Sequence, residues 1–139
     1  MALIGVAIVF LAYRGEAPKI EREAENFQSF WRTFRAAVVA GDTNGVMART
    51  AFPFKTRGPL DDDPVKTHPA EEFPAMLAML LRQDAGVAAA ETPMKDLIAR
   101  TDTVAERNFD RGHKTVRLGA FVFQVVDGKW WFTMAYTAG

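Results

Sequence analysis

The chain has 139 residues, and its seventeen basic and seventeen acidic side chains give a formal net charge of zero. Hydrophobic residues make up 49% and charged residues 24%, which is ordinary for a globular domain and excludes a disordered or low-complexity chain. The sequence has no cysteine, which excludes a disulfide scaffold, a thiolate zinc site and a cysteine nucleophile. A nucleic-acid binder usually has an excess of basic residues, so we expect no nucleic acid as a partner.

The first segment of note is residues 2–12, an apolar run without any polar side chain. It is shorter than the roughly 20 apolar residues that span a bilayer, so we expect no stable membrane span. It fits the apolar region of a secretory signal, although no basic residue precedes it and Pro18 follows the candidate cleavage site. The alternative is a buried segment of the domain. We expect residues 1–17 to be an export signal, which implies a periplasmic or secreted protein, and residues 18–139 to form one domain.

The strongest helix signal runs from residue 20 to residue 38, where apolar side chains recur with spacings of four and three and so share one face. These positions are Ile20, Ala24, Phe27, Trp31, Phe34 and Val38. Gly41 is expected to end this helix. Asp42 can then cap a short second helix that reaches about Arg49.

The middle of the chain predicts two strands and two helices. Thr50–Arg57 predicts a strand in which Pro53 marks an edge or a bulge, because proline cannot donate a ladder hydrogen bond. Residues 58–64 predict a turn, and residues 65–68 a short returning strand. The later apolar spacing predicts a helix over residues 73–81 with Pro74 in its first turn, and a second helix over 93–100 capped by Thr92.

The last part of the sequence predicts a β-hairpin, because Asp127-Gly128 favours a two-residue turn between Thr115–Val126 and Lys129–Thr137. That turn predicts that Phe123 opposes Phe132 and that Phe121 opposes Met134. One face is then apolar and must pack on helices, which predicts an α+β fold. The residues expected on that face are Phe121, Phe123, Val125, Trp130, Phe132, Met134 and Tyr136.

The order of these elements, with the segments Ala40-Gly41-Asp42, Phe52-Pro53-Phe54 and Val126–Phe132, resembles the nuclear transport factor two-like superfamily, also called the cystatin-like α+β roll. The resemblance covers roughly Glu21 to Tyr136. It implies a long N-terminal helix packed on a strongly curved antiparallel sheet, with a cone-shaped cavity between them. The sequence looks most similar to small exported bacterial members of unassigned role, which share a stretch like Phe52–Pro64.

The resemblance also implies where a ligand would bind, since the cavity of this fold is lined by the inner faces of helix and sheet. The residues expected to line it are Phe27, Trp31, Phe34, Phe123, Trp130 and Tyr136. A small apolar ligand would suit them; the alternative is a filled core, because aromatic stripes usually serve packing. On the opposite sheet face, Trp131 with Gln124 and Thr133 is expected to form a homodimer contact.

Few side chains point to chemistry. Asp61, Asp62 and Asp63 are adjacent carboxylates that favour turn formation over a metal site. The two histidines, His68 and His113, fall in segments that predict exposed loops, without metal-ligand spacing or a serine and aspartate partner nearby. The sequence therefore predicts no catalytic residue, no metal site and no cofactor.

Three functional hypotheses follow. The first is an exported, non-catalytic module that binds a small molecule or a protein. The second is a small enzyme of the isomerase or hydrolase type that uses a cavity carboxylate or a histidine. The third is a partner-binding protein of the immunity or inhibitor type, in which the face around Trp131 would be the contact.

Overall fold

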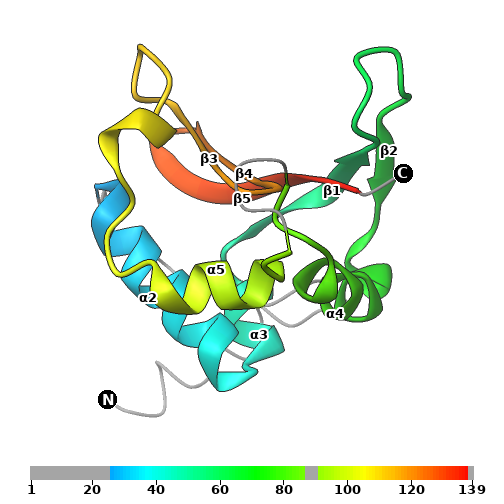
Figure 1. The fold of residues 1–139 in the computed structure, drawn as a ribbon, viewed down its shortest axis with the longest axis horizontal. Helices are drawn as coiled ribbons and strands as arrows, with labels where there is room; N and C mark the ends of the chain where they lie inside the picture. The colour runs from blue at the N-terminus through cyan, green and yellow to red at the C-terminus, as the bar shows by residue number, and fades with distance from the viewer. Residues whose placement is uncertain (1–25, 87–90, 138–139) are drawn as a thin grey trace, which may run out of the picture.

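The computed structural model describes residues 26–86 and 91–137, and these form an α+β fold (Figure 1). In chain order the elements are α2 (Phe27–Ala40), α3 (Thr43–Met47), β1 (Thr50–Arg57), β2 (Lys66–His68), α4 (Phe73–Arg82), α5 (Met94–Arg100), β3 (Thr115–Leu118), β4 (Phe121–Val126) and β5 (Lys129–Tyr136). Two short 3₁₀ turns, Ala70–Glu72 and Glu106–Asn108, precede α4 and β3. The expected export segment and residues 20–25 of the expected first helix lie outside the described residues.

The five strands form one mixed sheet in the order β2-β1-β5-β4-β3. Neighbouring strands are antiparallel except β1 and β5, which run parallel, so the expectation of an antiparallel sheet was wrong for this pair. A parallel pair needs a crossover connection, and the segment that holds α4 and α5 provides it. The four helices lie on one side of the sheet (Figure 1), which confirms that one sheet face packs on helices. We call the other side the outer face.

The end of α2 and the cap of α3 are as predicted, but α2 begins only at Phe27, so the expectation of one continuous helix over residues 20–38 was wrong at Asn26. The Asn26 side chain accepts a hydrogen bond from the Ser29 N–H at 2.9 Å and begins α2. Gly41 ends α2 in the left-handed conformation, with φ 69°. The Asp42 side chain then caps α3 by accepting from the Gly45 N–H at 3.0 Å.

Three predictions concerned prolines, and the structure agrees with those for Pro53 and Pro74 but not with the predicted cap before Pro93. β1 has the predicted bounds, and its register shifts between Thr50 and Lys55, so Pro53 lies at a bulge. Pro53 also lies at an edge of the sheet, as the other alternative expected, because β2 pairs only with Phe54–Thr56. Pro74 lies in the first turn of α4 as predicted. Thr92 does not cap α5; Pro93 occupies the N-cap position instead, and no side chain caps it.

The C-terminal hairpin keeps the predicted register from Val126 opposite Lys129 to Phe123 opposite Phe132. A bulge then shifts it, so Phe121 opposes Ala135 rather than Met134, and that expected pair was wrong. The inserted residue moves Met134 and Tyr136 to the outer face, because side chains alternate along a strand.

The expected single strand over residues 115–126 is two strands, β3 and β4, joined at Gly119 and Ala120. Gly119 has φ +56°, and a Cβ built there would lie 2.8 Å from side-chain atoms of Leu97 and Met94 and 2.9 Å from the Ala85 carbonyl oxygen. The turn is therefore pressed against α5 and the segment that follows α4, and only glycine fits it.

The core is aromatic, and Phe132 lies at its centre. Its ring centroid is within 6.3 Å of five other phenylalanine rings, from α2, from α4 and from three strand positions. These rings belong to Phe34, Phe54, Phe73, Phe121 and Phe123, and each is fully buried. The space between α2 and the sheet is thus filled by packed rings.

Candidate functional site

Five of the six residues expected to line a cavity are part of this packed core. The ring of Phe27 lies 4.9 Å from Trp130 and 6.2 Å from Trp31, and Phe34 lies 5.0 Å from Phe123. All five are buried. This close packing supports the filled-core alternative. Tyr136 lies apart from them on the outer face, where its ring centroid is 4.2 Å from the Arg117 guanidinium.

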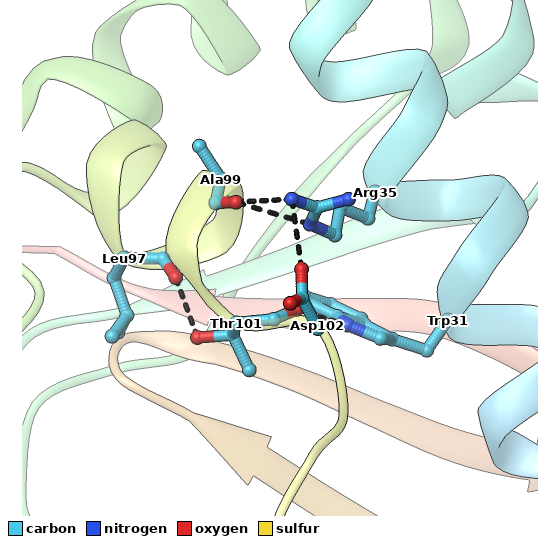
Figure 2. A network of polar contacts seen from close by, with 6 residues as sticks. All are labelled: Trp31, Arg35, Leu97, Ala99, Thr101 and Asp102. Carbon is cyan, nitrogen blue, oxygen red and sulfur yellow. Dashed lines mark hydrogen bonds and ion pairs between the residues drawn. The ribbon is translucent and has the colours of Figure 1, made fainter.

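Trp31 also connects α2 to the C-terminus of α5 (Figure 2). Its Nε1 donates to the Thr101 carbonyl oxygen at 2.8 Å. One turn further along α2, Arg35 donates through Nε to the Ala99 carbonyl oxygen at 3.1 Å and forms an ion pair with Asp102 at 3.2 Å. The carbonyl groups at the C-terminus of α5, which lack partners within the helix, are satisfied in this way.

A pocket lies at the other end of the sheet, between α4 and the β1–β2 hairpin, and we call it the α4 pocket. Its volume is about 580 Å³, within the range of small-molecule sites. Its lining residues come from the hairpin, from the turn between its strands, from α4 and from the end of β5: Thr56, Arg57, Gly58, Asp63, Pro64, Lys66, His68, Ala75, Met76, Met79 and Thr137. None of them belongs to the expected aromatic set.

The two walls of the α4 pocket differ in chemistry. The α4 wall is apolar and includes Met76 and Met79, and Met79 is 44% exposed although it is a large hydrophobic residue. The hairpin wall carries three basic side chains, Arg57, Lys66 and His68, and one carboxylate, Asp63, which accepts a hydrogen bond from the Leu60 N–H. Lys66 opposes Thr56 in the antiparallel pair, so the two side chains project from the same face of the hairpin.

The hairpin wall also holds a chain of polar contacts. Thr56 Oγ1 lies 2.8 Å from His68 Nε2, and His68 Nδ1 lies 3.2 Å from Glu72 Oε1. Thr56 is buried, His68 is partly buried in β2, and Glu72 is largely exposed. The prediction that His68 lies in an exposed loop was therefore wrong, because residues 66–68 pair with β1 and turn its ring toward Thr56.

The acidic turn before β2 behaves as the sequence predicted. Asp63 Oδ2 accepts a hydrogen bond from the Leu60 N–H at 2.8 Å, and the Arg57 guanidinium donates to the carbonyl oxygens of Leu60 and Asp61. These contacts fix the turn. Among residues 26–86 and 91–137, no group of three or more acidic, histidine or cysteine side chains could hold a metal ion.

The three residues expected at a dimer contact lie together on the outer face. Gln124 opposes Trp131 in the β4–β5 pair, and the Thr133 hydroxyl donates to Gln124 Oε1 at 2.8 Å. These three residues lie close together because of the register of the β4–β5 hairpin. The homodimer itself stays a prediction.

His113 lies in an exposed turn, as predicted, at the opposite end of the sheet from β2. Its Nε2 contacts Glu106 Oε1, and this hydrogen bond to a carboxylate raises the pKa of His113 above its ordinary value of 6.5. Nearby, backbone N–H groups of Thr115 and Lys114 donate to Asp110 and lower the pKa of that carboxyl. Both pairs tie residues 106–115 together.

We expect NMR titration of the His113 ring to give a pKa above 6.5 in the natural chain and a lower pKa in the Glu106→Gln variant. Because folding raises the pKa of His113, the contact with Glu106 stabilises the folded state. This contribution is complete at a pH below the ordinary imidazole pKa, and it is lost as the pH rises through the raised pKa of the folded state. An unchanged pKa in Glu106→Gln would contradict the assigned cause.

Within the described part of the chain, no helix is long and apolar enough to cross a membrane. Comparison with known proteins gives no match to a family model, to a curated protein or to a solved structure. The α4 pocket and its residues therefore carry what can be inferred about function.

Proposed function

We propose that this protein is a small-molecule-binding module and that its ligand occupies the α4 pocket. The observation that carries the proposal is the pairing of an apolar methionine wall with a basic hairpin wall around a space of about 580 Å³. A ligand that satisfies both walls has an apolar body and an anionic end. The proposal keeps the small apolar ligand expected from the sequence and adds the charged group.

The chemistry of the walls supports this ligand class. Methionine side chains are flexible and polarisable, so Met76 and Met79 can adapt to an apolar body of variable shape. Lys66 places a cation on the facing wall. A carboxylate, sulfonate or phosphate at the end of the ligand would form a charge-assisted hydrogen bond there.

We also propose that the module is an exported member of the nuclear transport factor two-like superfamily. The support is the resemblance in element order together with an α+β arrangement in which helices cover one sheet face. The apolar run at residues 2–12 supports the periplasmic or secreted location. The mature N-terminus, determined by mass spectrometry, would decide whether residues 1–17 are removed.

Fluorescence titration with anilinonaphthalene sulfonate, which has an apolar body and one anionic group, tests the α4 pocket. We expect saturable binding that the Met79→Glu variant weakens at least about tenfold, because it places a carboxylate in the apolar wall. Met79 is exposed, so this change leaves the core intact. Lys66→Gln should weaken binding several-fold by removing the cation.

The matched control is Val126→Glu, which places the same carboxylate at an exposed position on β4, a strand that contributes nothing to the α4 pocket. It should bind the probe as the natural chain does. Equal affinity in all variants, or a loss confined to Val126→Glu, would contradict binding in the α4 pocket.

A further inference from the structure

The polar contacts on the hairpin wall place a hydroxyl, an imidazole and a carboxylate in series. Thr56 Oγ1 is 2.8 Å from His68 Nε2, and His68 Nδ1 is 3.2 Å from Glu72 Oε1. We call these three residues the Thr56 triad. Enzymes that activate a hydroxyl as a nucleophile use the same order of groups, with the base within hydrogen-bond reach of the hydroxyl and oriented by a third group.

The contacts decide which nitrogen of His68 can act as a base. A carboxylate oxygen accepts hydrogen bonds, so the contact with Glu72 favours the tautomer of the His68 ring that carries its proton on Nδ1. Nε2 then carries the lone pair and faces the Thr56 hydroxyl, which donates to it. The ring is therefore in the tautomer and orientation that accept a proton from Thr56.

The surroundings of Thr56 suit acyl transfer. Thr56 is buried in the wall of the α4 pocket, and Lys66 opposes it in the strand pair and lines the same space. An acyl chain held by Met76 and Met79 would place its carbonyl carbon at the hairpin wall. The ammonium group of Lys66 would then stabilise the negative charge that develops on the carbonyl oxygen.

We propose that the Thr56 triad hydrolyses esters of short or medium acyl chains bound in the α4 pocket. This inference rests on the proposed function, because it needs the ligand in that pocket. The Thr56 oxygen bonds to the acyl carbon and its proton passes to His68 Nε2; the bond to the alcohol oxygen then breaks, and His68 returns the proton to the alcohol. Water next adds to the acyl-threonine and gives its proton to His68. The Thr56 oxygen leaves, takes that proton back, and the carboxylic acid is released.

Thr56 and His68 are the catalytic residues in this scheme, and Glu72 is a positioning residue. The first test is hydrolysis of para-nitrophenyl butyrate by the full chain. We expect turnover that Thr56→Val lowers at least about 100-fold, since removing a triad member costs a large part of the rate. Thr56→Ser, which keeps a hydroxyl, should retain activity. Intact-mass analysis after rapid quenching should show a butyryl adduct that maps to Thr56.

His113→Gln is the matched control for His68→Gln, because His113 lies outside the α4 pocket. Turnover should fall at least about 100-fold in His68→Gln and stay unchanged in His113→Gln. Glu72→Gln should lower kcat about tenfold or more with little change in KM, and Glu72→Asp should recover part of it.

Probe binding separates the failure of this inference from the failure of the proposed function. Thr56→Val and His68→Gln should still bind anilinonaphthalene sulfonate, which also shows that they fold. Binding without hydrolysis in the natural chain would overturn the Thr56 triad as a catalyst and leave the binding module standing. Hydrolysis that persists in Thr56→Val with wild-type kcat would also overturn it. Absence of both binding and hydrolysis would overturn both proposals.

Discussion

Replacing Phe132 with alanine is expected to lower the free energy of unfolding by about 3–5 kcal/mol, the range for large aromatic residues truncated in a core. The Phe132 ring is fully buried and touches five other phenylalanine rings from α2, α4 and the strands. Its removal would leave a cavity among rigid rings that cannot collapse into it. The total free energy of unfolding of a small domain is about 5–15 kcal/mol, so the variant would be marginally stable.

Urea unfolding followed by circular dichroism would measure this loss as a lower midpoint with an unchanged slope. The control is Val126→Ala on the same sheet, because Val126 is 45% exposed and its loss should cost less than about 0.5 kcal/mol. A loss below about 1 kcal/mol in Phe132→Ala would mean that the core around it is loosely packed.

Replacing Gly119 with alanine is expected to lower the free energy of unfolding by about 3 kcal/mol. Two costs combine: the left-handed backbone at φ +56°, about 1 kcal/mol for a residue with a Cβ, and a clash with the Ala85 carbonyl oxygen at 2.9 Å. The side-chain atoms of Leu97 and Met94 could move aside, but the Ala85 oxygen belongs to the backbone and cannot move without disturbing the segment between α4 and α5, where the Ala85 N–H bonds to the Thr92 carbonyl oxygen. The β3–β4 turn would therefore be pushed away from α5.

Gly128→Ala is the matched control, because Gly128 also has a positive φ, +78°, but nothing lies within 4 Å of its Cβ position. Thermal or urea unfolding should give about 1 kcal/mol for Gly128→Ala, the backbone cost alone. The difference between the two variants measures the close approach at Gly119. Equal losses would show that the turn does not press on α5.

The elements that sequence reasoning predicted well are those fixed by local signals. Gly41 and Asp42 mark helix boundaries through their own backbone and side-chain chemistry, and both were confirmed. The Asp127-Gly128 turn predicts the register of the residue pairs next to it, but the predicted register holds only as far as the bulge beyond Phe132. No local residue pattern predicts a bulge of this kind, so the positions of Met134 and Tyr136 could not be read from the alternation.

The contacts that form the candidate site are not local. Thr56 and His68 meet only because β1 and β2 pair in one register, and the seven residues between these expected strands leave several registers open. His68 and Glu72 are four residues apart, a spacing that was visible in the sequence. This spacing indicates a site only together with the structure, in which His68 lies in β2 and its second ring nitrogen contacts the Thr56 hydroxyl.

The position of β5 has a consequence for the order of folding during synthesis. β5 comes last among the five strands in the chain, yet it lies in the middle of the sheet, between β1 and β4. The carbonyl of Arg57 accepts its hydrogen bond from the Thr137 N–H across 80 positions of sequence. The β1–β2 hairpin, with the α4 pocket on its wall, therefore has no central partner until β5 leaves the ribosome. Assembly of the site is thus coupled to completion of the sheet, a long-range step that is slow compared with helix formation.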